Sequence, residues 1–600
     1  MLRTHTCGEL RKEHEGETVC LCGWAKKIRT HGNVTFIDLR DRYGITQTVF
    51  NEQFKRETDH ISRESVLRIT GKVVRKPEPN KSLKTGEIEI QTASFELLNK
   101  AAPLPMEQED PDNITEDTRL KYRFLDLRRQ DMQESIMLRH RLTKAVRDFF
   151  DKEGFLDIET PVLTKSTPEG ARDYLVPSRV HQGKFFALPQ SPQIFKQLLM
   201  VSGFDRYMQI VKCFRDEDLR ADRQPEFTQI DIEMSFVTEE DIFSTVDRML
   251  KHVWKSVLNK DVKLPIQKVT YAEAMSRFGT DRPDMRFGME LKDVTSVFTN
   301  SLFKVFSETV EANGKIKCIT AESFGGASRK EIEALETAAR EAGAKGLVTL
   351  KVSDDLEGGV AKFLSDKEKS ELRKASGAEK GDLLLMVADA NHTVVDSALG
   401  ALRCRLGKEL GLYNDGEHCF VWVTDFPLLE WDHDEKRHVA VHHPFTSPKL
   451  EDISLLEVDP GKVRARAYDI VLNGVEIGGG SIRIHQPEVQ NTVFRLLNIS
   501  KEEAEMKFGF LLNALKYGAP PHGGIAFGMD RMVMLMAGRD SIREVIAFPK
   551  NKNCVSIMDD APNVVSSAQL DELGIQLKIC LLYTSPSPRD RTRSRMPSSA

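Results

Sequence analysis

Residues 214–233 carry the side chains whose types and spacing most directly indicate chemistry. An apolar run leads into Arg215 and Glu217, a charged loop closes at Pro225, and a second apolar run begins at Phe227. This pattern predicts two strands joined by a charged loop. An arginine, an aromatic ring and carboxylates on such strands can hold a charged, planar ligand. A hairpin with solvated charges is the alternative, but an unpaired guanidinium beside apolar neighbours would be costly.

Residues 469–483 form a second stretch of this kind. Asn473-Gly474 is a strong signal for a type I′ hairpin turn, which can bring Asp469 and Glu476 together. Two carboxylates in a phosphate-binding site are best explained as Mg²⁺ ligands. The glycines at 478–480 let the backbone approach a ligand closely, and Arg483 can bind a carboxylate through two hydrogen bonds. An exposed hairpin with solvated acids is the alternative, which the glycine run disfavours.

The stretch around Arg215 resembles motif 2 of class II aminoacyl-tRNA synthetases, most closely that of aspartyl-tRNA synthetases. Residues 154–163 resemble motif 1 of this class, and residues 524–531 resemble motif 3. The resemblance covers about residues 1–578 with the motifs in order, and it is to the bacterial type of the aspartyl family. It implies a multidomain α+β fold with an N-terminal OB-type β-barrel, a class II antiparallel sheet flanked by helices, and an α+β insertion domain.

The resemblance implies a nucleotide site. Arg215 would hold the α-phosphate of ATP, Phe227 would stack on adenine, and Arg531 would bind the triphosphate. Asp530 stands where many class II enzymes have glutamate. The metal site for Mg²⁺ would consist of Asp469 and Glu476. The implied ATP-binding residues are Arg215, Asp216, Glu217, Gln224, Phe227, Glu476, Gly528, Met529, Asp530 and Arg531.

An aspartate site is implied in the same way. Lys196 and Arg483 would pair with the side-chain carboxylate of the substrate. Residues 166–172 resemble a mobile loop that closes over aspartate, although the residues alone are also compatible with an ordinary turn. Paired histidines at 442 and 443 could suggest zinc, but adjacent side chains diverge and no partner has ligand spacing, so zinc is not expected. The implied aspartate-binding residues are Glu169, Ser191, Gln193, Lys196, Arg215, Asp231, His442 and Arg483.

Other elements must position a second, RNA-binding surface. Five strand-like runs lie before residue 105, with a helix-compatible segment at 52–65 between the third and the fourth. This order fits a small OB-type barrel, a fold that often binds single-stranded nucleic acid. By resemblance, the tRNA anticodon contacts are Arg29, Phe36 and Gln47, although Phe36 could equally be a core residue. Histidine at position 31 resembles the family type that charges two tRNAs, so His31 bears on tRNA discrimination. The predicted strands are residues 18–24, 34–39, 45–50, 66–75 and 87–98.

We expect the domains to follow one another in a defined order. Residues 106–130 form a hinge with an acidic and then a basic half, either beside bound tRNA or simply solvated. The serine-, proline- and arginine-rich residues 581–600 are interpreted as a non-native tail, with a disordered RNA-binding arm as the alternative. The expected domains are the anticodon-binding barrel at 1–105, the catalytic domain at 131–284 and 416–560, the insertion domain at 285–415, and a C-terminal extension at 561–580.

Bulk composition narrows the class of protein. Charged residues make up 30% and hydrophobic residues 40%, as in ordinary soluble domains. The net charge of −5 gives no global sign of nucleic-acid binding, so any RNA contact must come from local basic patches. We find neither a signal-peptide core nor an apolar run long enough to cross a membrane, which predicts a cytoplasmic protein. Nine scattered cysteines favour reduced thiols.

The expected function is ATP-dependent ligation of L-aspartate to tRNA(Asp) through an aspartyl-adenylate, with ATP and Mg²⁺ as cofactors. Charging of tRNA(Asn) as well would imply a partner amidotransferase, and an enzyme restricted to tRNA(Asp) is the alternative. The motif 1 resemblance implies a homodimer. A class II-like asparagine synthetase would not need the barrel, and a catalytically inactive RNA-binding regulator would be expected to lack parts of the ATP site.

Overall fold

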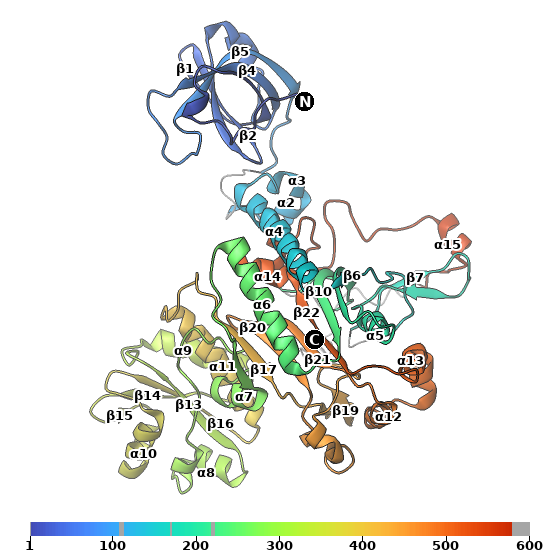
Figure 1. Ribbon diagram of the computed structural model, residues 1–600. Coiled ribbons are helices and arrows are strands. Elements are labelled where there is room, and N and C mark those ends of the chain that lie inside the picture. Colours follow the sequence, from blue (N-terminus) through green and yellow to red (C-terminus); the bar gives the residue numbers. More distant parts are fainter. Residues whose placement is uncertain (1, 107–112, 168–170, 218–221, 579–600) are drawn as a thin grey trace. The chain divides into compact units, whose positions relative to one another are not determined.

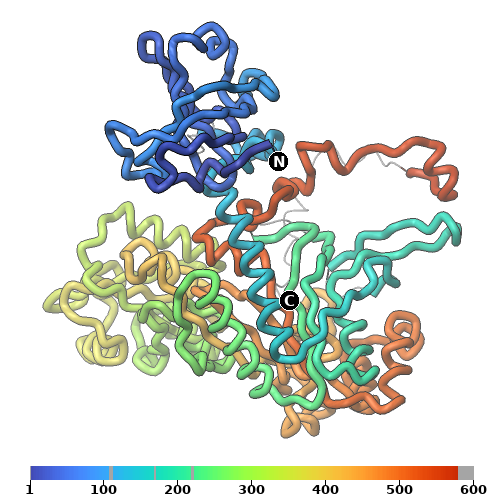
Figure 2. Tube along the Cα trace, turned by 45° about the horizontal axis from the view of Figure 1, so that its top comes forward, coloured from blue at the N-terminus to red at the C-terminus, as the bar shows by residue number. Residues whose placement is uncertain are grey.

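The computed structural model describes residues 2–106, 113–167, 171–217 and 222–578 (Figure 1). The chain forms two compact units, one of residues 1–137 and 543–563 and the other of residues 138–542 and 564–600. The tube along the Cα trace in Figure 2 lets the reader follow the chain through each unit. Among the described residues, no helix combines the length and apolar character that crossing a membrane requires. All eight described cysteines are free thiols, as expected.

The first unit contains the predicted barrel. Its five strands close in the order β1-β2-β3-β5-β4, which confirms the OB-type fold. The first strand is longer than expected because it serves two neighbours: residues 18–24 pair with β4, a bulge follows Ala25, and the remainder pairs with β2. Such a bulge bends the strand and lets the sheet close. The strands are β1 (Thr18–His31), β2 (Val34–Asp41), β3 (Gly44–Phe50), β4 (Val66–Arg75) and β5 (Ile88–Asn99).

The helix between β3 and β4 is shorter than the sequence suggests. A 3₁₀ turn (Glu52–Phe54) leads into α1 (Lys55–Thr58), after which the chain leaves the helical path. Two backbone hydrogen bonds join this segment to β1. The Glu64 N–H donates to the Ala25 carbonyl, and the Ala25 N–H donates to the Ser65 carbonyl. Ile61 is buried in the barrel core. Tertiary hydrogen bonding and burial therefore override the local helical preference of residues 59–65.

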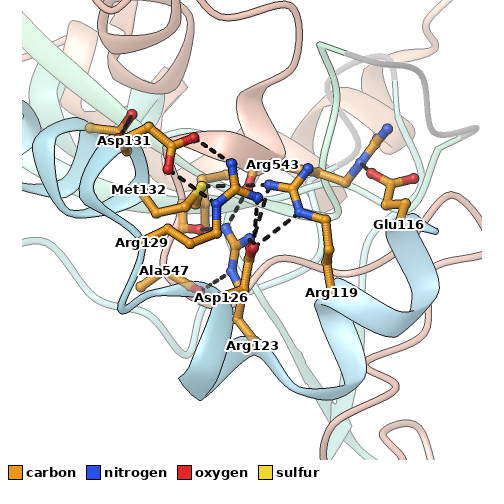
Figure 3. Close-up of polar contacts among 11 residues, drawn as sticks. Glu116, Arg119, Arg123, Asp126, Arg129, Asp131, Met132, Arg543 and Ala547 are labelled. Atoms are coloured by element: carbon orange, nitrogen blue, oxygen red, sulfur yellow. Dashed lines mark hydrogen bonds and ion pairs between the residues drawn. The ribbon is translucent and has the colours of Figure 1, made fainter. Parts of the chain in front are cut away.

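The arginines that follow the barrel, at positions 119–129, are largely engaged in contacts within the protein (Figure 3). Asp126 is completely buried and accepts from Arg119, Arg123 and Arg129 at 3.1, 2.6 and 3.2 Å. Arg123 also donates to the backbone carbonyls of residues 543, 546 and 547. These contacts join residues 116–132 to the segment 543–547, so this part of the hinge is not a solvated connector. The helices here are α2 (Glu116–Lys121) and α3 (Arg123–Asp126).

The second unit is built on an eight-stranded sheet in the order β11-β17-β20-β21-β22-β10-β9-β6. The six central strands are antiparallel, and the edge strands β11 and β6 pair in parallel with their neighbours. The segment that resembles motif 1 forms only a two-residue strand at the sheet edge, which ends before Pro161, a residue that cannot donate a hydrogen bond to a neighbouring strand. The strands are β6 (Leu156–Asp157), β9 (Arg206–Phe214), β10 (Glu226–Ser235), β11 (Gln267–Thr270), β17 (Phe420–Thr424), β20 (Ala467–Leu472), β21 (Val475–Ile482) and β22 (His522–Gly528).

Helices cover this sheet and bury its apolar face. Phe243 of α6 packs against Trp422 and Tyr468 of the sheet, with ring centroids 4.6 and 5.2 Å apart. A separate cluster joins Ile194 of α5 to Phe494 and Phe508 of α12 and α13. The helices are α4 (Gln130–Lys152), α5 (Gln193–Val201), α6 (Glu239–Leu258), α7 (Tyr271–Phe278), α12 (Pro487–Leu496), α13 (Lys501–Leu515), α14 (Met529–Met536) and α15 (Ser567–Leu573), with hairpins β7 (Leu175–Pro177) to β8 (Phe185–Ala187) and β18 (Leu429–Asp432) to β19 (Arg437–Ala440).

The predicted α+β insertion has its own sheet and core. Five strands in the order β12-β13-β16-β14-β15 are packed by helices on apolar clusters that include Leu335, Leu385 and Leu402. Arg403 of α11 is completely buried and donates to the carbonyls of residues 284, 287 and 288. The elements are β12 (Lys292–Asp293), α8 (Lys304–Glu311), β13 (Lys315–Ala321), α9 (Arg329–Glu341), β14 (Val348–Val352), β15 (Leu356–Glu357), α10 (Asp366–Ser376), β16 (Leu383–Asp389) and α11 (His392–Glu409).

Candidate active site

One cavity of about 380 Å³ lies on the sheet of the second unit, over β10, β21 and β22. It brings together residues from stretches separated by more than 300 positions. Asp216 and Met529 are not among its lining residues, and Glu169 lies outside the described residues. The predicted residues that line it are Ser191, Gln193, Lys196, Arg215, Glu217, Gln224, Phe227, Asp231, His442, Asp469, Glu476, Arg483, Gly528, Asp530 and Arg531.

Strand alternation explains how β10 contributes to the cavity. Phe227, Gln229 and Asp231 are spaced by two residues, so their side chains leave the same face of the sheet. All three line the cavity. Glu233 continues this face one step further, where it is completely buried. One strand therefore supplies an aromatic ring at one end of the cavity and carboxylates at the other.

A buried network of four charges forms the inner end of the cavity. The Lys196 ammonium lies 2.6 Å from Asp231 and 3.2 Å from Glu233. The Arg483 guanidinium donates to both oxygens of Glu233 at 2.9 and 3.0 Å, and to Ser481 Oγ at 2.8 Å. Paired in this way, two cations can be kept in a dry site at an acceptable electrostatic cost. Such a site can accept an additional carboxylate.

Glu233 belongs to this buried network, although it was not among the predicted site residues. It is flanked by apolar residues, and its partner Arg483 lies 250 positions away. Burial opposes its ionisation, but Arg483 and Lys196 lower the pKa of Glu233 to about 2. Burial raises the pKa of Asp231 despite the adjacent Lys196. The sequence indicated only that the side chains at positions 231 and 233 leave the same face of the strand. The role of Glu233 became apparent once the structure placed Arg483 beside it.

The outer end of the cavity combines an aromatic ring with cations. The Arg215 guanidinium lies 5.0 Å from the centre of the Phe227 ring. Arg531 donates to the Glu476 carbonyl at 3.0 Å and to Asp222 at 3.1 Å. Glu217 is paired with Arg223 at 2.9 Å. A flat ring beside a guanidinium group, in a cavity that Arg531 also lines, suits a planar base that carries phosphates.

An acidic pair lies between these two ends. The type I′ turn is confirmed, because Asn473 and Gly474 have φ of +53° and +80° and join β20 to β21. Burial and the neighbouring Asp469 raise the pKa of Glu476. His442 Nε2 lies 3.4 Å from Asp469, and although burial opposes its charge, that carboxylate raises the pKa of His442. Both acids therefore favour a nearby cation.

The glycine run allows the backbone to approach these groups. A Cβ at Gly480 would lie 2.1 Å from the carbonyl oxygen of Gly524 on β22. A Cβ at Gly479 would lie 2.6 Å from Asp469 Oδ1. Both distances are far inside van der Waals contact. Any larger residue here would displace the strand or the carboxylate that the cavity presents.

Comparison with known proteins identifies the family. A model described as tRNA synthetases class II (D, K and N) matches residues 115–552, and one described as OB-fold nucleic acid binding domain matches residues 19–98. A protein named aspartate–tRNA(Asp/Asn) ligase from Desulfatibacillum aliphaticivorans is 54% identical over 586 residues, covering 96% of this chain and 98% of that protein. The chain belongs to the class II aspartyl-tRNA synthetases. A protein named aspartate–tRNA ligase from Geobacillus kaustophilus is also 54% identical, over 581 residues, and covers 96% of this chain and 98% of its own length.

Solved structures share the fold of this synthetase. An asparaginyl-tRNA synthetase from Pyrococcus horikoshii, complexed with asparaginyl-adenylate, is similar with a TM-score of 0.58 at 18% identity, covering 92% of this chain and 98% of that chain. An aspartyl-tRNA synthetase from Entamoeba histolytica has a TM-score of 0.57 at 18% identity, covering 91% of each chain. The fold is therefore shared beyond close sequence relatives.

The barrel of the synthetase gathers the predicted anticodon residues. Arg29 lies 2.7 Å from Asp38 and 3.3 Å from the Gln47 side-chain oxygen. The same oxygen accepts from Lys76 at 2.9 Å, while the Gln47 amide nitrogen donates to Glu89. Phe36 is partly exposed rather than a core residue, and the exposed His31 lies edge-on to it at 6.0 Å. Asp38 and Glu89 were not singled out in the sequence, because their proximity to Arg29 and Gln47 depends on barrel closure.

Three predicted nucleotide residues have other contacts. Asp216 forms a backbone bridge with Arg172, and Met529 is almost completely buried. Asp530 lines the cavity, but its carboxylate contacts Arg139 of α4 and the backbone of Thr228. The structure thus brings most of the predicted site together and gives Asp530 a partner that the sequence did not indicate.

Proposed function

We propose that this synthetase ligates L-aspartate to tRNA(Asp), and also to tRNA(Asn), through an aspartyl-adenylate. The observation that carries the proposal is the buried pair of cations, Lys196 and Arg483, at one end of a cavity whose other end holds Arg215 and Phe227. The inner end suits a carboxylate and the outer end suits a nucleotide. Reaction between them is the adenylation step of amino-acid activation.

Selection of aspartate follows from the charges. Lys196 and Arg483 would bind the side-chain carboxylate, and Asp231 would accept from the ammonium group. The buried Gln193 Nε2 has no hydrogen-bond partner among the described residues, so it is available to a ligand. Asparagine would offer these cations a neutral amide in place of a carboxylate, and its amide N–H groups would face other donors, so it would bind less well than aspartate. Aspartate is therefore favoured by electrostatics rather than by shape.

Adenylation needs no protein nucleophile. The α-carboxylate of aspartate attacks the α-phosphorus of ATP, and the cavity supplies orientation. Arg215 would stabilise charge that develops on the α-phosphate, while Arg531 would neutralise the departing pyrophosphate. Phe227 would hold adenine by stacking. A terminal ribose hydroxyl of the tRNA then attacks the aspartyl carbonyl and releases AMP.

Asp469 and Glu476 fit a Mg²⁺ site of the kind completed by substrate. The described residues contain no cluster of three or more histidine, cysteine or acidic side chains that could hold a metal. Mg²⁺ commonly binds one or two carboxylates together with substrate phosphates, so two acids suffice once a nucleotide is present. When bound, the ion supplies charge neutralisation to the phosphates. Burial and Asp469 raise the pKa of Glu476, so a bound cation would favour its ionised form.

Charging of tRNA(Asn) is supported by the histidine at position 31, which lies beside Phe36 on the barrel. A bacterial enzyme with this relaxed specificity would act in the cytoplasm with an amidotransferase. A homodimer is supported by Leu156, Val162 and Leu163 in the motif 1 segment, each about half exposed. An apolar edge of this kind suits a subunit interface.

The test is aspartate charging of purified tRNA(Asp) and tRNA(Asn) transcripts by the chain ending after Leu577. We expect comparable charging of both. Charging of tRNA(Asp) alone would be consistent with the proposed adenylation of aspartate but would refute the charging of tRNA(Asn). No charging of either, together with no aspartate-dependent exchange of pyrophosphate into ATP, would refute the function as a whole.

A further inference from the structure

The contact between Asp530 and Arg139 joins three elements that have no local sequence relationship. Arg139 is on α4, Asp530 is in the first turn of α14, and Thr228 is on β10. Arg139 Nη1 donates to Asp530 Oδ1, and Arg139 Nη2 donates to Thr228 Oγ1 at 2.9 Å. Asp530 Oδ2 accepts from the Thr228 backbone N–H at 2.8 Å. The three residues thus form a closed triangle of hydrogen bonds.

Strand pairing explains why this triangle is needed. Gln229 of β10 pairs with Gly528, the last residue of β22, so Thr228 lies just beyond the paired region. A backbone N–H buried at such a point requires another acceptor. Asp530 supplies it two residues after β22 ends. The Asp530 carboxylate, on the helix, therefore extends the hydrogen bonding of the sheet by one residue. Arg139 balances its negative charge.

The neighbours of the triangle give it a function. Thr228 follows Phe227, the ring at the nucleotide end of the cavity, and Asp530 precedes Arg531, whose guanidinium reaches Glu476 and Asp222. A single carboxylate thus fixes the backbone beside the ring and the helix turn beside the arginine. Asp530 is only 3% exposed, and the Arg139 side chain is 21% exposed. The contact is shielded from solvent, so it is stronger than a surface ion pair.

We propose that Arg139 is a positioning residue for ATP, acting through Asp530 to set the spacing between Phe227 and Arg531. The inference rests on the proposed function, because Phe227 and Arg531 contact ATP only if the cavity binds it. It also changes the role expected of Asp530, whose carboxylate holds the protein wall instead of the nucleotide. No part of the triangle contacts Lys196 or Arg483, so the aspartate end of the cavity is independent of it.

The experiment is aspartate-dependent exchange of pyrophosphate into ATP by Arg139→Gln in the full chain, with KM measured separately for ATP and aspartate. A small displacement of binding groups can reduce a rate about 100-fold, so we expect kcat/KM for ATP to fall about 10- to 100-fold, mainly through KM. KM for aspartate should stay within about twofold of the wild-type value. A purely structural role would reduce the active fraction and leave both KM values unchanged, which would overturn the proposal.

Four further variants sharpen the result. Arg139→Lys keeps the charge opposite Asp530 but cannot reproduce the fork to Thr228, so it should have an intermediate KM for ATP. Asp530→Asn should resemble Arg139→Gln, and the double variant should be no worse than the poorer single variant, because both remove one contact. Additive losses would refute a shared path. Arg248→Gln is the matched control, since Arg248 pairs with Glu153 at 2.6 Å and donates to the Ser244 carbonyl away from the cavity.

Two outcomes distinguish the inference from the function it rests on. If the wild-type chain performs the exchange and Arg139→Gln binds ATP normally, only the positioning role fails. If the wild-type chain shows no exchange, the proposed function fails first. Should Arg139→Gln not fold, Arg139→Lys and Asp530→Asn carry the same measurement, and an unchanged KM for ATP in both would overturn the proposal.

Discussion

Replacement of Arg483 by alanine tests the aspartate site most directly. The guanidinium makes three buried hydrogen bonds, two to Glu233 and one to Ser481. Its removal leaves Glu233 with Lys196 alone, which is shared with Asp231. Breaking a buried ion pair by deleting one partner costs about 3–5 kcal/mol. Because Lys196 still pairs with Glu233, we expect a loss of stability near the lower end of this range.

The loss of aspartate activation should be larger than the loss of stability explains. A hydrogen bond to a charged group contributes about 1.5–3 kcal/mol, so losing two from the substrate carboxylate corresponds to about 3–6 kcal/mol. At 1.36 kcal/mol for each factor of ten, kcat/KM for aspartate should fall about 10²- to 10⁴-fold. The assay is aspartate-dependent exchange of pyrophosphate into ATP, at a temperature where thermal unfolding shows the variant to be folded.

Arg466→Ala is the matched control. Arg466 binds both oxygens of Glu239 at 2.9 and 2.5 Å, is also largely buried, and does not line the cavity. It should lose comparable stability while keeping its KM for aspartate. Near-normal aspartate activation by Arg483→Ala, or an equal loss in Arg466→Ala, would refute the assignment of Arg483 to the substrate carboxylate.

Three further predictions address Glu233, Glu476 and Gln47. Because the pKa of Glu233 is lowered to about 2 from 4.5, its stabilisation is complete above pH 4.5 and is lost as pH falls towards 2; Glu233→Gln should remove this part of the acid dependence of unfolding. Glu476→Gln should raise the Mg²⁺ concentration needed for half-maximal exchange at least about tenfold, whereas an unchanged requirement would exclude Glu476 as a ligand. Gln47→Ala should raise KM for tRNA about 5- to 150-fold, corresponding to about 1–3 kcal/mol, without affecting exchange measured in the absence of tRNA; weakened exchange would contradict a role confined to RNA.

Local residue patterns were sufficient for the elements that depend on near neighbours. The Asn473-Gly474 turn follows from the ability of both residues to adopt positive φ, and alternation in β10 follows from the two-residue period of a strand. The barrel strands were recognisable from their apolar runs. Strand ends were less predictable, as the seven further residues of β1 show, because pairing with distant neighbours determines them.

The sequence by itself therefore determined the local elements and, through resemblance, the family and most of the cavity residues. Only the tertiary structure decided which charges are partners. Glu233 meets Arg483 across 250 positions and Arg139 meets Asp530 across 391. The physical reason is that the energy of a charge depends on its burial and on the groups around it, and both arise only when distant strands and helices pack together.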